Sequence, residues 1–113
     1  MLPGGPGHLG LEQDERVVEL IRFVYESGKP LAAICAAPSI LGKMGLLKNK
    51  RATCFPGYEK FLEGAETTTD PVVYDAPFIT GKGAGTAAAF GFEIVKLLKG
   101  TETAEKIRGL MQY

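Results

Sequence analysis

The sequence lacks tryptophan, carries no net charge and has only one histidine and two cysteines among its 113 residues. Because basic residues are not in excess, the composition does not indicate a positively charged surface that would bind nucleic acid or an acidic membrane, and we expect neither partner. No apolar run approaches the roughly 20 residues that a membrane-spanning helix needs. The two cysteines, with no basic-then-apolar leader at the N-terminus, predict free thiols and a cytoplasmic location.

Glycine, in contrast, is abundant, and its 15 residues stand at turns instead of forming a low-complexity tract. They separate segments with strand-like and helix-like patterns, and no internal repeat is present. The length fits one domain, so we treat residues 1–113 as a single domain. Residues 31–34 are apolar on both faces, which is typical of a covered strand in a parallel sheet.

The local patterns predict a loop over residues 1–10, followed by alternating helices and strands. Helices are expected over residues 11–27, 38–47, 87–99 and 102–111, with Thr101 as the cap of the last one. A single helical turn is expected over residues 58–62. Strands are expected over residues 31–34, 52–55, 72–76 and 78–80, and residues 67–69 are β-prone.

One stretch, from Leu31 to Pro38, has the pattern of a nucleophile elbow. An apolar strand ends on Cys35, and Pro38 suits the first turn of a helix, where its missing N–H costs nothing. A thiol reacts as the thiolate, which the N-terminus of a helix favours. Ala36 and Ala37 leave space beside the sulfur. Free cysteines are often inert and buried, but this context predicts that Cys35 is catalytic.

Other residues suggest weaker hypotheses. The adjacent Gly4 and Gly5 can aim successive N–H groups at one anion, or form a plain turn. His8 is a candidate auxiliary base, although an exposed loop histidine without a catalytic role is the more common situation. Cys54 has no helix start behind it and is predicted to be structural. The glycine-rich residues 81–85 match a phosphate-binding loop poorly, because a glycine follows Lys82 where that motif needs Ser or Thr.

Together these features resemble the ThiJ/PfpI superfamily, and within it the YajL-like branch. The resemblance rests on four stretches in the expected order: residues 2–5, 32–38, 55–56 and 83–86. It implies a flavodoxin-like three-layer α/β sandwich with a mostly parallel sheet, no cofactor, no metal and a homodimer. The family fold opens with a βαβαβ portion that has no counterpart here. We therefore expect a partial domain that pairs with a second copy or with a complementing N-terminal fragment.

The resemblance also implies roles for individual residues. Cys35 would be the nucleophile and the oxidisable thiol. The backbone N–H groups of Gly5 and Ala36 would form an oxyanion pocket, with Gly4 and Phe55 also in the substrate site. Phe55 stands where some members have a histidine near the thiol. The family's glutamate that hydrogen-bonds the cysteine has no match in this sequence, so we expect impaired activity.

The activity that the resemblance implies is cofactor-free glyoxalase or deglycase chemistry. Its substrates would be small aldehydes of the methylglyoxal type, or proteins that such α-oxoaldehydes have glycated. A redox-sensing stress protein or chaperone that uses an oxidisable Cys35 is an alternative of another class, since it needs no base. A PfpI-type peptidase or an amidotransferase ranks last, because each needs a histidine downstream of the cysteine and this chain has none.

Overall fold

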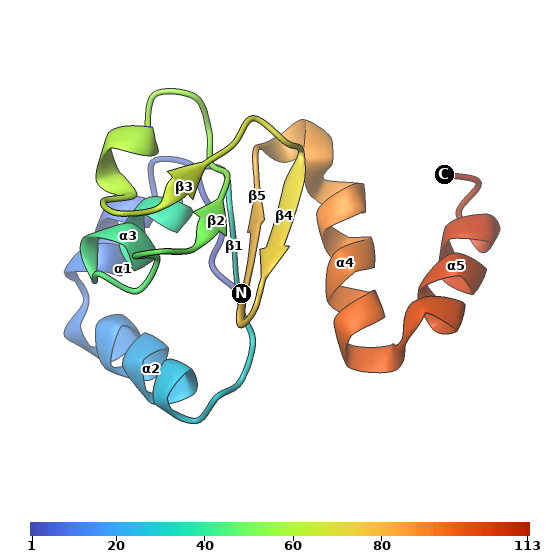
Figure 1. Ribbon diagram of the computed structural model, residues 1–113, viewed down its shortest axis with the longest axis horizontal. Coiled ribbons are helices and arrows are strands. Elements are labelled where there is room, and N and C mark those ends of the chain that lie inside the picture. Colours follow the sequence, from blue (N-terminus) through green and yellow to red (C-terminus); the bar gives the residue numbers. More distant parts are fainter.

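The computed structural model describes residues 1–113 as an α/β sandwich (Figure 1). A three-stranded sheet has the order β1-β5-β4, in which β1 is parallel to β5 and β4 is antiparallel to β5. β2 and β3 form a separate parallel pair. The strands are β1 (Leu31–Ile34), β2 (Arg51–Ala52), β3 (Glu66–Thr67), β4 (Val72–Asp75) and β5 (Phe78–Gly81). The helices are α1 (His8–Gln13), α2 (Glu15–Glu26), α3 (Pro38–Lys43), α4 (Ala87–Lys99) and α5 (Thr101–Leu110), with 3-10 turns η1 (Glu59–Phe61) and η2 (Ala84–Thr86).

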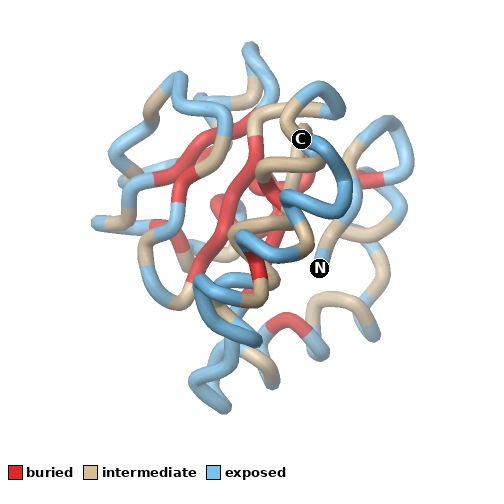
Figure 2. The backbone as a smooth tube through the Cα atoms, turned by 90° about the vertical axis from the view of Figure 1, so that its right-hand side faces the viewer, coloured by how far each residue is buried: buried red, intermediate tan, exposed pale blue.

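Helices cover both faces of the sheet. Successive side chains of a strand point to opposite faces, and in β1 and β5 the apolar side chains on each face pack in a separate core. On one face Ala33 and Phe78 belong to the larger core, which also includes side chains of α2 and α3. On the other face Ala32 and Ile79 pack with Phe90 of α4. The buried residues concentrate in the strands between these layers (Figure 2). The α/β sandwich that the sequence predicts is therefore confirmed.

The first 27 residues differ from the prediction. The single helix expected over residues 11–27 is wrong, because Asp14 ends α1 and caps α2. Asp14 has an extended backbone, and its carboxylate accepts a hydrogen bond of 2.9 Å from the backbone N–H of Arg16. Side-chain and backbone hydrogen bonds from Arg16 lower the pKa of Asp14. The loop expected over residues 1–10 is also wrong in part, since α1 begins at His8 and Leu2 forms a parallel bridge with Ala33.

Several helices and strands are shorter than predicted or begin at another residue. α3 ends at Lys43, not at residue 47, because Gly45 takes a left-handed φ of 76° and the Leu46 N–H bonds back to the Leu41 carbonyl at 3.1 Å. This arrangement is a glycine-terminated helix end. Of the strand expected over residues 52–55, only Ala52 lies in a strand, as the last residue of β2. Of the β-prone residues 67–69, only Thr67 does, as the last residue of β3. The N-cap of α5 is Gly100 and not Thr101, which is already helical.

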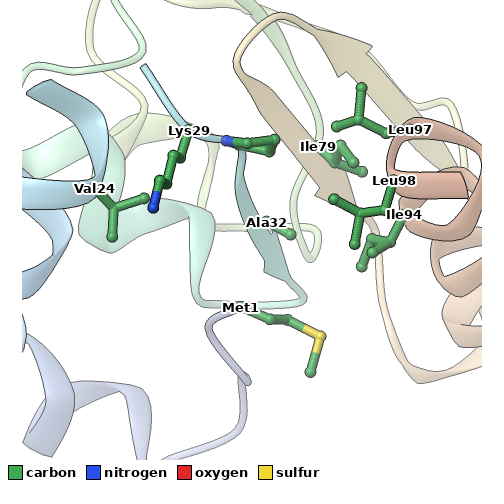
Figure 3. Close-up of a pocket in the computed structure, with 9 residues that line it drawn as sticks. Met1, Val24, Lys29, Ala32, Ile79, Ile94, Leu97 and Leu98 are labelled. Atoms are coloured by element: carbon green, nitrogen blue, oxygen red, sulfur yellow. The ribbon is translucent and has the colours of Figure 1, made fainter. Parts of the chain in front are cut away.

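An apolar groove of about 440 Å³ opens beside α4 (Figure 3). Its floor includes Ala32 and Ile79 of the sheet, and its walls come from α4 on one side and from the α2 end on the other. Nine residues line it: Met1, Val24, Lys29, Pro30, Ala32, Ile79, Ile94, Leu97 and Leu98. α5 packs on α4 and stands apart from the sheet (Figure 1). None of the helices is long and apolar enough to cross a bilayer.

Candidate active site

The elbow at Cys35 has the geometry that the sequence predicts. Cys35 has a φ of +66°, a left-handed conformation that is uncommon for a residue other than glycine. Its N–H donates to the Gly81 carbonyl at 2.9 Å, and its own carbonyl accepts from the Phe55 N–H at 2.7 Å. Backbone of this kind persists where the surroundings over-determine it, and it clusters at functional sites. Cys35 is therefore held in place by three parts of the chain: the end of β1, the end of β5 and the segment after β2.

Gly4 packs directly against this elbow. A Cβ atom at Gly4 would lie 2.6 Å from the Cys35 Cβ and 2.9 Å from the Ile34 carbonyl oxygen. Both distances are too short for any real side chain, so only glycine allows this approach. Gly5 follows with a φ of +75°. The two glycines thus serve close packing and a left-handed turn, which explains the residues at these positions.

A cavity of about 360 Å³ opens at Cys35. It brings together most of the residues that the sequence singled out, although they come from separate segments of the chain. Its lining is Gly5, Pro6, His8, Leu9, Cys35, Ala36, Phe55 and Tyr58. Gly4 lies behind this lining, in contact with Cys35. The cavity is large enough for a small organic substrate and is mostly apolar.

Two backbone N–H groups in the lining are free. Gly5 and Ala36 both lie outside helices and strands, and the backbone N–H of neither residue donates a hydrogen bond within the chain. The peptide between Cys35 and Ala36 is fixed by the Phe55 N–H that donates to its carbonyl oxygen. Because a trans peptide directs its N–H opposite to its carbonyl, the Ala36 N–H points away from Phe55. Free, oriented N–H groups beside a nucleophile can stabilise an oxyanion.

His8 is not the exposed loop histidine that is more common in proteins. It begins α1, and only 3% of its surface is exposed. Its Nδ1 lies 2.7 Å from the Gly5 carbonyl oxygen, and its ring meets Tyr58 edge-on with ring centroids 5.4 Å apart. Tyr58 is a site residue that sequence reasoning missed. Its only sequence signal was an aromatic residue shortly after Pro56 and Gly57, which does not reveal contact with His8.

The second thiol has a different environment. Cys54 is buried in the larger core, as the structural role predicted for it requires. Burial first, and then the negative charges of Glu59 and of a Cys35 thiolate, raise the pKa of Cys54 to about 11. Cys54 is therefore a protonated, unreactive thiol at neutral pH. Cys35 is only partly buried and lines the cavity.

No carboxylate lines the cavity, whose titratable side chains are those of Cys35, His8 and Tyr58. No group of three or more His, Cys, Asp or Glu side chains is placed to hold a metal ion. The arrangement can perform nucleophilic addition at Cys35, with backbone N–H groups near the thiol and one imidazole in the same cavity.

The model of the DJ-1/PfpI family matches residues 1–97. The chain belongs to the DJ-1/PfpI family. A deglycase from Pyrococcus abyssi is 34% identical over 101 residues, covering 88% of this chain and 61% of the relative. The glutathione-independent glyoxalase DJR-1.2 of Caenorhabditis elegans is 36% identical, covering 95% of this chain and 58% of that protein. An isonitrile hydratase from Pseudomonas putida is 32% identical, and the match covers 99% of this chain and 50% of that protein.

Solved structures of DJ-1/PfpI proteins have the same fold. The DJ-1 superfamily protein STM1931 of Salmonella typhimurium, crystallised as a cysteine-to-alanine mutant, superposes with a TM-score of 0.92 at 30% identity, covering 99% of this chain and 62% of that one. DJ-1beta of Drosophila melanogaster superposes with a TM-score of 0.87 at 34% identity, and the match covers 96% of this chain and 60% of that one. The chain thus spans about three fifths of the length of these DJ-1/PfpI relatives.

Proposed function

We propose that this chain carries the nucleophilic part of a cofactor-free glyoxalase or deglycase site, with Cys35 as the nucleophile. The substrates would be α-oxoaldehydes of the methylglyoxal type, or protein side chains that they have modified. One observation carries the proposal: Cys35 sits on a left-handed elbow that opens into a cavity beside two free N–H groups. The names of the relatives, deglycase and glyoxalase, support the same chemistry.

The reaction begins with addition of the Cys35 thiolate to the aldehyde carbon. A carbon–sulfur bond forms, and the carbonyl electrons move to oxygen, where the Gly5 and Ala36 N–H groups stabilise the negative charge. Protonation gives a hemithioacetal. A proton then leaves the former aldehyde carbon and another is delivered to the neighbouring carbon. This transfer oxidises the first carbon to a thioester and reduces the ketone to an alcohol, so no external oxidant is needed.

Water completes the cycle. It attacks the thioester, the carbon–sulfur bond breaks, and lactate and the free thiol are released. In a methylglyoxal-modified amino or thiol group, the former aldehyde carbon carries a hydroxyl group and the protein side chain. When the bond to that side chain breaks, the side chain leaves with the hydroxyl proton and the aldehyde carbonyl forms again. Cys35 then adds to this carbonyl and the reaction proceeds as for free methylglyoxal. We expect slow turnover in this chain alone, because the cavity holds no carboxylate and another of its titratable side chains must move the proton.

The experiment measures lactate formed from methylglyoxal by the wild-type chain and by a Cys35→Ser variant. We expect Cys35→Ser to lose about a hundredfold or more of the rate, because a hydroxyl is a far weaker nucleophile. Cys54→Ala is the matched control: it removes the other thiol, which lies in the core and outside the cavity. Equal rates for wild type and Cys35→Ser would reject Cys35 as the nucleophile.

We also propose that a further strand and helix cover the apolar groove beside α4. The Leu2 N–H donates to the Ala32 carbonyl at 2.7 Å, and the Ile34 N–H donates to the Leu2 carbonyl at 3.3 Å. Because these groups alternate along a strand, the Ala32 N–H faces the same edge, where a further strand can pair with it. A complementing N-terminal segment, of the kind that the longer relatives have room for, would supply both this strand and the groove's cover. A second copy of the chain is the competing occupant.

A further inference from the structure

We propose that the Nε2 atom of His8 is the general base that moves the proton between the two carbons of the substrate. The proposal rests on the proposed function and names its missing catalytic group. The step needs a group that both accepts and returns a proton within the same cavity. Of the three titratable side chains in the lining, Cys35 is occupied by its bond to the substrate. His8 and Tyr58 remain.

The hydrogen bond at Nδ1 fixes which His8 nitrogen is available. Gly5 offers a carbonyl oxygen, which only accepts, so the 2.7 Å contact requires a proton on Nδ1. In the neutral imidazole the other nitrogen, Nε2, then has a free lone pair. Nε2 makes no hydrogen bond within the chain. The tautomer that serves as a base is therefore the one that the fold selects.

The ring is also held in position. The Gly5 carbonyl accepts from the backbone N–H of His8 at 3.1 Å as well as from the side chain, so the same atom anchors both. The Tyr58 ring stands edge-on to the imidazole at 81°. Gly5 also contributes one of the free N–H groups near Cys35. A single residue thus couples the position of the base to that of the oxyanion pocket.

His8 makes no hydrogen bond to the Cys35 sulfur, so the two do not form a direct cysteine–histidine pair. Both line the same cavity, so a small substrate bonded to Cys35 would lie in the cavity that His8 also lines. His8 consequently acts on the carbon-bound proton of the adduct and not on the thiol. Its loss should leave formation of the Cys35 adduct intact while stopping the later proton transfer.

The decisive variant is His8→Asn. The Asn side chain can place an amide N–H where Nδ1 lies, keeping the hydrogen bond to Gly5, but it has no atom equivalent to the basic Nε2. With methylglyoxal as the probe, we expect lactate formation to fall by about 10²-fold or more. The mass of the rapidly quenched protein should still show the adduct on Cys35. In a His8→Ala variant, added imidazole should restore part of the lactate rate.

The outcomes separate this proposal from the proposed function. If His8→Asn keeps its lactate rate within about threefold of wild type while Cys35→Ser loses it, His8 is not the base. If Tyr58→Phe loses turnover and His8→Asn does not, the base is Tyr58. A wild-type chain that forms the adduct but no lactate overturns the base and leaves the nucleophile standing. A chain that forms no adduct at Cys35 overturns both.

Discussion

Two thiols in one small chain have opposite environments. Cys35 is held in a left-handed conformation and opens into a cavity, whereas Cys54 is enclosed by the core. The sequence predicted this division, because only Cys35 stands between a strand and a proline-started helix. It did not predict the position of His8, because the burial of that ring depends on Tyr58, which is distant along the chain.

The raised pKa of Cys54 predicts a pH dependence of stability. A pKa of about 11 in the folded chain lies above the ordinary thiol value of 9.0, so folding favours the protonated form. The stabilising contribution is complete below pH 9 and declines as the pH rises through the window from 9 to about 11. Urea unfolding under reducing conditions should show wild type losing stability faster than Cys54→Val over that window. Parallel curves for the two proteins would contradict the assignment.

At the scale of elements, β1, β4, β5 and α4 were predictable from local signals, because apolar runs bounded by glycine or proline mark them. The division between α1 and α2 was missed. Asp14 followed by Glu15 is a good cap signal, but Leu11 and Val18 continue a helical spacing across it. The early end of α3 was missed as well, although Gly45, whose left-handed φ ends the helix, is a local signal in the sequence.

Gly42 tests how α3 packs on η1, because the two elements are in contact and Gly42 lies against Phe61. A Cβ at Gly42 would overlap the Phe61 carbonyl oxygen, whereas a Cβ at Gly91 in α4 would meet nothing within 4 Å. We expect Gly42→Ala to lower the free energy of unfolding by about 2 kcal/mol through overpacking. The matched change Gly91→Ala should raise it by up to about 1 kcal/mol through helix propensity. Urea denaturation measures both, and equal effects would mean that α3 does not pack closely on η1 at Gly42.

For the whole molecule, the open feature is the apolar groove between the α2 end and α4. Leu98 lines this groove and is 64% exposed, while Leu110 at the end of α5 is 76% exposed but lies outside it. We expect the isolated chain to bind a hydrophobic dye, and Leu98→Gln to remove about half of that signal or more, because clustered apolar surface binds such probes. Leu110→Gln should have a smaller effect.

The same measurement identifies the occupant of the groove. Loss of the dye signal on adding a complementing N-terminal segment would support the proposed strand and helix. Loss of the signal with rising chain concentration, together with a doubled mass by light scattering, would instead indicate a second copy. A dye signal that is equal in both leucine variants would show that the groove is not the binding surface.

The backbone partners of Cys35 have a consequence for folding. Its close neighbours, Gly4, Phe55 and Gly81, come from segments far apart in the chain and meet only after long loops have closed. Contacts of such large sequence separation form slowly compared with local helices. The left-handed geometry at Cys35 is therefore a property of the finished fold alone. In a mixed preparation, the fraction of chains with native Cys35 chemistry reports the fraction that has folded completely.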